Sequence, residues 1–397
     1  MNSMVTTDDN PTAVDVKIDK LTSDADVYAL VDSLREASSS SSAPIALDFR
    51  SLARARPQRI NAHRTEIVAN ALLTEFAETD LIVHPPSSPN GRKNLERAGL
   101  AFAIRQRPPR LTHLETDRQK ESWPAVDWGR TWSPFDSNFR QRIFEVGDEP
   151  DVLLDGKFVT FLNPHAYAAD DDLVWELTEN QAGEWISQLV RTRPTWVDSV
   201  HELGERKKTQ QELIGKLRRV IYELVTNLSY AFCSHNVAGR ARRNFLQRSY
   251  VQLYVTRGGT NSFDRLHFVA ADTGFGIVAT LLPKLVRSGE YDESSSELII
   301  RQLINTELPD YGRSSGRGYD RITSILKEYS GDLFLTTGFA NSSGQCQTMR
   351  AHSQYVAAES SKLRIIRDER LRFRGTTAHV ILRLDESNRD DLDKTTV

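Results

Sequence analysis

The chain has 397 residues, of which 39% are hydrophobic and 26% are charged, and its formal net charge is −3. This composition is typical of a globular protein with two or three domains, and the small net charge gives no global attraction to nucleic acid or to an anionic membrane. The two cysteines, Cys233 and Cys346, supply neither a disulfide framework nor a metal motif. No apolar run reaches the ~18 residues that a membrane span needs, and the N-terminus does not resemble a signal peptide. We therefore expect a cytoplasmic protein with no membrane segment.

The first 108 residues predict a polar tail followed by a small α/β domain. Residues 1–12 have the composition of a disordered tail. Hydrophobic patterns predict strands at 14–18, 44–49, 81–83 and 100–104, and helices at 23–37, 60–76 and 92–98. The serine run Ser38–Ser42 predicts a flexible connector. Strands that alternate with helices favour an α/β domain over residues 13–108.

This order of elements resembles a STAS domain, the fold of anti-sigma-factor antagonists. The second helix, the strand Leu81–Val83 and the stretch Asn94–Leu100 carry the resemblance. It is a resemblance of architecture, which many α/β domains share.

Residues 109–204 differ in composition and are expected to form a connector. All six tryptophans of the chain lie here, among several prolines: Trp123, Trp128, Trp132, Trp175, Trp185 and Trp196. One interpretation is that these side chains pack the neighbouring domains together. The other is a surface for a protein partner, because tryptophan is favoured at interface hot spots. The three consecutive aspartates Asp170–Asp172 do not predict a metal site, because adjacent side chains do not converge.

From Gln210 onward the spacing of apolar residues predicts a long helix that carries two polar side chains on one face. Glu223 and Asn227 are separated by four residues, so both project from the same side of the helix. The amide oxygen of Asn227 is a ligand that Mg²⁺ accepts, and the carboxylate of Glu223 can deprotonate a water molecule. A polar stripe with only local hydrogen bonds is the structural alternative.

The stretch Asp272–Ile277 predicts a turn at the end of a buried strand. Residues 250–255 and 266–271 form an antiparallel pair, and Asp272 ends the second strand. Gly274 and Gly276 then allow the backbone to turn tightly and to approach a ligand. The carboxylate of Asp272 can accept a hydrogen bond from the exocyclic amine of adenine. An antiparallel setting disfavours a dinucleotide fold, which requires a βαβ unit.

The remaining elements include a second glycine-rich stretch. Helices are expected at 278–286, 296–305 and 321–329, and strands at 333–337 and 378–384, before a disordered tail at 387–397. The segment before the helix at 321 contains Gly312, Arg313, Ser314, Gly316, Arg317 and Gly318. Glycine-rich backbone at a helix N-terminus binds phosphate, and arginines add charge. A glycine hinge is the alternative.

Four motifs occur in order, and together they resemble the GHKL superfamily with its Bergerat fold. They are Glu223-x-x-x-Asn227, Asp272-x-Gly274-x-Gly276, Gly316-x-Gly318 and Gly375-Thr376-Thr377. The resemblance covers residues 205–386. It implies an α/β sandwich in which helices back a mixed, largely antiparallel sheet.

The resemblance also implies a role for each motif. ATP and Mg²⁺ would bind, with Asn227 as the metal ligand, Glu223 as the base and Asp272 as the adenine reader. Gly274, Gly276 and Ile277 would lie against the nucleotide, Gly312–Gly318 would form a phosphate lid, and Thr376 or Thr377 would lie near adenine. Tyr230, Tyr319 and Asp320 depart from the pattern of the superfamily.

Three activities are compatible with these motifs. The first, which we favour, is an ATPase that acts as a nucleotide-controlled switch on a protein partner, in bacterial regulation or phage defence. The second is a protein kinase of the anti-sigma serine type or the histidine type, for which His201 lies too close to Glu223 to be a typical phosphoacceptor. The third is a non-catalytic nucleotide-binding scaffold. A homodimer remains open. Direct nucleic-acid binding is not the favoured role, because charge runs on helices are usually solvated faces, although three groups add local positive charge: Arg206–Lys208, Arg218–Arg219 and Arg240–Arg243.

Overall fold

The computed structural model divides the chain into two compact units, Met1–Gly129 and Arg130–Val397, which we describe separately. The structure describes residues 13–19, 21, 23–40, 43–50, 62–84, 100, 103–104, 112–114, 157–162, 171–193, 196, 203–231, 249–256, 264–286, 292–308, 317–340, 344–355 and 362–384. No helix in these ranges is long and apolar enough to cross a membrane.

The first unit contains a parallel four-stranded sheet, and its fourth strand, at Thr112–Leu114, was not predicted. Its strands lie in the order β1 (Val14–Lys17), β2 (Ile45–Asp48), β3 (Leu81–His84) and β4 (Thr112–Leu114). Helix α1 (Asp24–Ser40) follows β1, and α2 (Ala62–Thr74) follows β2. The buried side chains of α1 recur at helical spacing, from Val27 through Leu30, Val31 and Leu34 to Ala37. The α/β class of this unit is confirmed, and the finer likeness to a STAS domain stays a resemblance.

Two predictions in this unit are wrong. The serines Ser38–Ser40 continue α1 instead of leaving it, because the hydroxyls of Ser39 and Ser40 donate to the carbonyls of Glu36 and Ala37. The run expected as a strand at 100–104 is helical at Leu100 and at residues 103–104. Leu100, Ala103 and Ile104 are all buried with a spacing of three and four, which is the period of a helix. A continuous apolar run does not distinguish the two periods.

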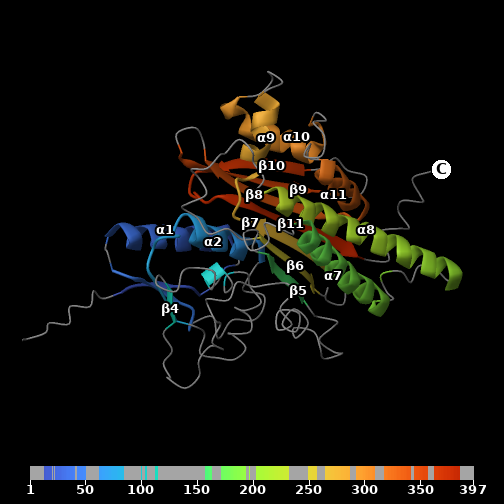
Figure 1. Ribbon diagram of the computed structural model, residues 1–397, viewed down its shortest axis with the longest axis horizontal. Helices are drawn as coiled ribbons and strands as arrows, with labels where there is room; N and C mark the ends of the chain where they lie inside the picture. The colour runs from blue at the N-terminus through green and yellow to red at the C-terminus, as the bar shows by residue number, and fades with distance from the viewer. Residues whose placement is uncertain are drawn as a thin grey trace, which may run out of the picture. The chain divides into compact units, whose positions relative to one another are not determined.

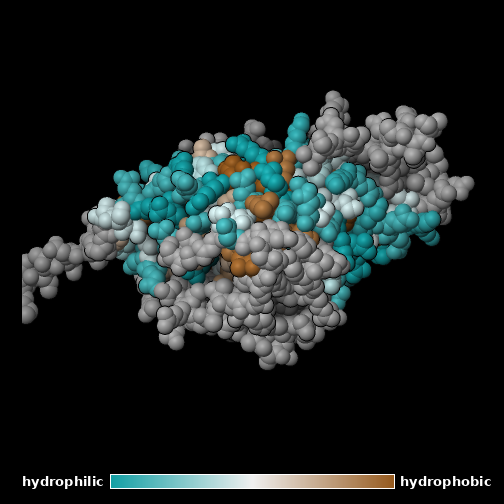
Figure 2. Space-filling view, turned by 90° about the horizontal axis from the view of Figure 1, so that it is seen from above, coloured by the Kyte–Doolittle hydropathy of each residue, from teal (hydrophilic) through white to brown (hydrophobic). Residues whose placement is uncertain are grey.

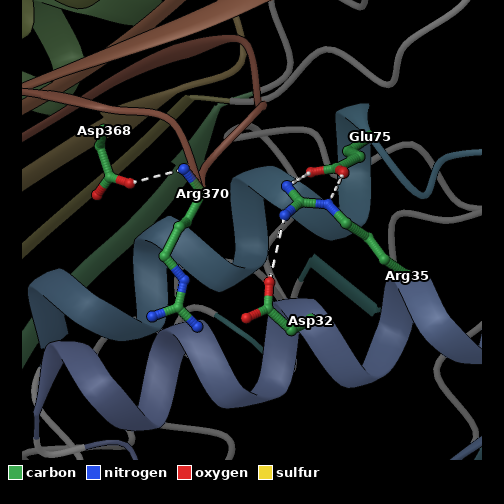
Figure 3. A network of polar contacts seen from close by, with 5 residues as sticks. All are labelled: Asp32, Arg35, Glu75, Asp368 and Arg370. Carbon is green, nitrogen blue, oxygen red and sulfur yellow. Dashed lines mark hydrogen bonds and ion pairs between the residues drawn. The ribbon is translucent and has the colours of Figure 1, made fainter.

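Ion pairs join α1 to the end of α2 in the first unit. The guanidinium of Arg35 binds Glu75 through two bonds, Nε to Oε1 at 2.5 Å and Nη2 to Oε2 at 2.9 Å, and it also contacts Asp32 (Figure 3). Such a two-point pair fixes the relative orientation of the two helices. The same figure shows a local contact of the second unit, in which Asp368 accepts a hydrogen bond from the backbone nitrogen of Arg370.

The second unit is built on a seven-stranded sheet in which every described pair of strands is antiparallel. The order is β10-β9-β8-β11-β7-β6-β5. The strands are β5 (Lys157–Leu162), β6 (Ser249–Thr256), β7 (Asp264–Asp272), β8 (Asp332–Ala340), β9 (Cys346–Gln354), β10 (Lys362–Asp368) and β11 (Gly375–Leu384). The predicted antiparallel pair of β6 and β7 is confirmed, whereas the mixed character expected for the sheet is not seen in these pairs.

Helices cover one face of this sheet (Figure 1). They are α7 (Asp171–Thr192), α8 (Leu203–Tyr230), α9 (Ile277–Val286), α10 (Ser296–Asn305) and α11 (Arg317–Glu328), with a 3-10 turn at Glu293–Ser295. Apolar side chains of all five helices and of alternate strand positions form one core, which includes Leu217, Leu224, Phe268, Leu335 and Val380. In Figure 2 the coloured surface of the molecule is mostly hydrophilic, with only small hydrophobic areas.

The segment expected as a connector contributes structure to the second unit. Strand β5 pairs with β6 at the edge of the sheet, and α7 packs against α8. Trp196 belongs to the core, and its indole Nε1 donates to Asp264 on β7 at 3.1 Å. For this side chain, packing within one unit replaces the expected packing between domains. Trp123, Trp128 and Trp132, as well as Asp170, lie outside the described residues.

Candidate functional site

Asp272 stands at the end of β7, as predicted, and its carboxylate organises the turn that follows. The side-chain Oδ1 accepts hydrogen bonds from the backbone nitrogens of Gly274 at 2.8 Å and of Thr376 at 3.2 Å. Thr376 lies directly opposite Asp272 in the ladder between β7 and β11. The buried carboxylate therefore connects two sequence motifs that are about a hundred residues apart.

The glycines of this region are required by neighbouring backbone. A Cβ added at Gly274 would lie 2.3 Å from the carbonyl oxygen of Ala231, at the end of α8. One at Gly276, which has a φ of +80°, would lie 2.4 Å from the carbonyl oxygen of Gly338 on β8. One at Gly375, with a φ of +101°, would lie 1.9 Å from the carbonyl oxygen of Asp272. At these three positions the space of a side chain is occupied by protein backbone. The sequence had suggested instead that glycine leaves room for a ligand.

Two threonine hydroxyls join the same turn. The backbone nitrogen of Ile277, the first residue of α9, donates to Thr337 Oγ1 at 2.8 Å, and that oxygen lies 3.3 Å from Thr376 Oγ1. Successive side chains of a strand point to opposite faces of the sheet. Thr376 is thus on the helix-covered face beside Asp272, whereas Thr377 points to the other face, where its buried hydroxyl has no partner among the described residues. Of the two threonines, the fold places only Thr376 beside the predicted adenine reader.

Glu223 and Asn227 lie on the buried side of α8. Glu223 is 5% exposed, and its Oε1 accepts a hydrogen bond from Arg321 Nη1 of α11. Asn227 is half-buried, and its amide nitrogen is enclosed without a hydrogen-bond partner among the described residues. An enclosed polar atom without a partner is costly, so this amide is a position that a ligand or a water molecule would satisfy.

The glycine-rich stretch is described only from Arg317 onward. Gly312, Arg313, Ser314 and Gly316 lie outside the described residues, and of Arg317 only the backbone is described. The helix begins at Arg317, four residues before the predicted start, so Gly318 lies in its first turn. A Cβ at Gly318 would lie 2.7 Å from Glu223 Oε2, which shows that the backbone of α11 touches this carboxylate.

Tyr319 connects α11 to the other end of the site. Its phenol is buried in the core, and this burial, together with the nearby charge of Asp272, raises the pKa of the phenol above its ordinary value. The first turn of α11 therefore contacts Glu223 through Gly318 and lies within electrostatic reach of Asp272 through Tyr319. The described residues of the four predicted motifs thus form two contacting pairs, Asp272 with Thr376 and Glu223 with Gly318, and Tyr319 brings the second pair within electrostatic reach of the first.

Several residues of this site were not singled out from the sequence. Gly338 interrupts an apolar strand pattern, which is a signal of close backbone approach, and Thr337 precedes it. Arg321 follows Gly318 at helical spacing, but nothing local indicates that it would bind Glu223. Strands β9 and β10 were also missed, although Leu363 and Ile365 alternate with polar neighbours.

Comparison of the chain with known protein families, with curated proteins and with solved structures gives no match. The function must therefore be argued from the site itself. His201, the alternative phosphoacceptor, lies outside the described residues. Among the residues that the structure describes, no group of three or more His, Cys, Asp or Glu side chains could hold a metal ion.

Proposed function

We propose that the second unit binds ATP with Mg²⁺ and hydrolyses it, and thereby acts as a nucleotide-controlled switch. The observation that supports this most directly is the convergence of four separated motifs at one end of the sheet. Asp272 of β7 is bonded to Thr376 of β11, and Glu223 of α8 touches Gly318 of α11. Tyr319, the next residue of α11, lies within electrostatic reach of Asp272 and connects the two pairs. A buried, polar cluster assembled from distant elements is the usual character of a binding site.

Asn227 is the residue that fits the magnesium ion. Its amide presents an enclosed polar atom without a partner in the described structure. A half-turn of the amide exchanges its nitrogen and oxygen, so the side chain can offer an oxygen ligand at the same place. Mg²⁺ keeps most of its water and uses few protein ligands, which agrees with a single amide. When bound, the ion neutralises charge on the phosphates of the substrate.

Glu223 is the residue that we assign to the chemical step. Its carboxylate would accept a proton from the water molecule that attacks the γ-phosphorus of ATP. The bond from that phosphorus to the bridging oxygen breaks, and the products are ADP and phosphate. The carboxylate is buried, which is the setting in which a base can be oriented and shielded from bulk water.

The test of nucleotide binding uses Asp272→Asn. Asparagine keeps the oxygen that accepts from Gly274 and Thr376, so the fold is retained, whereas its new NH₂ group opposes the amine of adenine. We expect Mg·ATP affinity in isothermal titration calorimetry to fall at least about tenfold, from the cost of an unpaired buried donor. An unchanged urea midpoint would establish that the variant is folded. Unchanged ATP affinity in that folded variant would contradict the assignment of Asp272.

The test of hydrolysis uses Glu223→Gln. We expect phosphate release to be lost while ATP binding persists. Radiolabel from the γ-phosphate that appears on protein instead of in solution would favour the kinase alternative. Binding without release or transfer would favour the non-catalytic scaffold.

A further inference from the structure

A hollow of about 450 Å³ opens between α7, α8 and α11 of the second unit. Its lining is rich in arginine and consists of Glu179, Gly215, Arg218, Arg219, Tyr222 and Arg321. Gly215 has no neighbouring atom within 4 Å of where a Cβ would stand, so the absent side chain leaves this part of the hollow open.

Two arginines of the hollow, Arg218 and Arg219, are not neutralised by an acidic neighbour among the described residues. Within the part of the chain that the structure describes, neither Arg218 nor Arg219 has an ion-pair partner. The guanidinium of Arg218 lies over the backbone of α7, because a Cβ at Gly183 would meet its Nε at 2.4 Å. Together with Arg321 these side chains face the hollow with one carboxylate, Glu179. The lining therefore favours an anionic ligand.

Arg321 belongs to this hollow and to the candidate active site at the same time. Its side chain is 54% exposed, whereas that of its partner Glu223 is 6% exposed. The charge and hydrogen bond of Glu223 raise the pKa of Arg321, so the guanidinium stays charged. A guanidinium has five donors and prefers to bind a carboxylate at two points. Glu223 holds Arg321 through Nη1, so a second carboxylate that binds the guanidinium at two points through Nη1 would compete with Glu223 for Arg321.

The form of the hollow favours an acidic protein segment over nucleic acid. A run of phosphates would face Glu179, and nearby on α8 the charge of Lys216 is already paired with Glu328 of α11. Tyr222 is 43% exposed at the hollow, and tyrosine and arginine are the residues enriched at protein interface hot spots. A single carboxylate that binds beside the ring of Tyr222 therefore matches this lining better than the continuous phosphate backbone of a nucleic acid.

We propose that this hollow binds a carboxylate-bearing segment of a partner protein, and that the bound carboxylate draws Arg321 away from Glu223. The second half of this inference rests on the proposed ATPase function. With Arg321 attached, one oxygen of Glu223 is engaged in the ion pair and is not available to a water molecule. Release of Arg321 frees that oxygen for water, and partner binding thereby activates hydrolysis.

The site is tested first without nucleotide. A fluorescein-labelled glycine–serine peptide that carries two separated glutamates is titrated with the full chain at low salt, and anisotropy reports binding. We expect affinity to fall at least about tenfold in the double variant Arg218→Ala/Arg219→Ala, through loss of charge-assisted hydrogen bonds. The matched control is Lys207→Ala/Lys208→Ala, which removes the same charge from exposed positions of α8 outside the hollow and is expected to retain the affinity. Equal loss in both variants would overturn the hollow as the binding site.

Competition distinguishes the source of the anion. An excess of the unlabelled peptide should displace the labelled peptide, whereas the same concentration of phosphate ion or of an oligothymidylate of equal charge should not. Stronger displacement by the oligothymidylate would show that the hollow binds nucleic acid and would overturn the choice of a protein segment.

The link to Glu223 is tested by binding as well, so that it does not depend on hydrolysis. If Glu223 competes for Arg321, Glu223→Gln should tighten peptide binding about fivefold or more, and this gain should vanish in the Arg321→Met background. Equal peptide affinity in the wild type and Glu223→Gln would overturn the coupling. The peptide should also raise the rate of phosphate release in the wild type, and not in Arg321→Met. Coupled binding with no phosphate release in any state would overturn the ATPase proposal and leave the hollow and its link to Glu223 in place.

Discussion

The two ends of the candidate site are held in different ways. At the Asp272 end, backbone packs on backbone, and the glycines at 274, 276 and 375 are each pressed against a carbonyl oxygen. At the Glu223 end, a buried carboxylate is held by the exposed side chain of Arg321. The first arrangement cannot change without refolding the turn, whereas the second changes with one side-chain rotation.

This difference indicates a division of tasks. A rigid backbone turn suits the recognition of a flat, invariant group such as a nucleobase, because it is preorganised and loses little entropy on binding. A side-chain ion pair at the edge of a site suits control, because a competing charge can break it at small cost. Substitutions at the two ends test this difference, and the Asp272 end is expected to tolerate an added side chain least.

The largest effect is expected for Gly375→Ala. The new Cβ would need to occupy a point 1.9 Å from the carbonyl oxygen of Asp272, at a φ of +101° that disfavours any side chain. We expect the free energy of unfolding, measured in urea, to fall by about 3 kcal/mol or more. Gly344→Ala is the matched control, because Gly344 has a φ of +80° but no atom within 4 Å. It should cost about 1 kcal/mol, and equal losses in the two variants would contradict the backbone contact.

An intermediate effect is expected for Gly318→Ala at the Glu223 end. The Cβ would meet the carboxylate of Glu223, so the variant should lose roughly 1–2 kcal/mol of unfolding free energy. In the Glu223→Ala background the same substitution has room, and alanine should then stabilise the helix by up to about 1 kcal/mol. If the change in unfolding free energy has opposite signs in the wild type and in Glu223→Ala, the contact between Gly318 and Glu223 is supported. The same loss in both backgrounds would refute it.

The smallest effect is expected on stability at acidic pH. It concerns Asp332, which side chains hold on the face of the sheet opposite to the helices. Burial opposes ionisation of Asp332, but the hydrogen bond of His352 and the charge of Arg383 outweigh it and keep the pKa of Asp332 below its ordinary value. Its ionised form therefore stabilises the fold above roughly pH 4, and this contribution is lost as the pH falls through the lowered pKa. Asp332→Asn should show a shallower loss of urea stability below that pH. Parallel curves for wild type and variant would contradict this role.

The sequence was informative where a pattern was long or local. The apolar stripe of α8 and the helix Ser296–Asn305 were predicted because each carries the period of a helix over two or more turns. The strand that ends at Asp272 was predicted as a short apolar run that a polar residue and glycines bring to an end. Boundaries were less certain where local chemistry overrides propensity, as in the serines that end α1. The apolar run that includes Leu100 and Ile104 was misassigned, since a continuous apolar run does not distinguish the period of a strand from that of a helix.

The sequence by itself determined the residue types at the site: a carboxylate and an amide one helical turn apart, an aspartate at a strand end, and glycines in two turns. Only the tertiary structure decided which of these meet. It brought Thr376, and not Thr377, to Asp272, because strand register sends adjacent side chains to opposite faces. It also placed Arg321 against Glu223, a contact across 98 positions of the chain that depends on how α11 packs on α8. Local sequence does not predict such a contact, because the contact forms only when the two helices pack against each other.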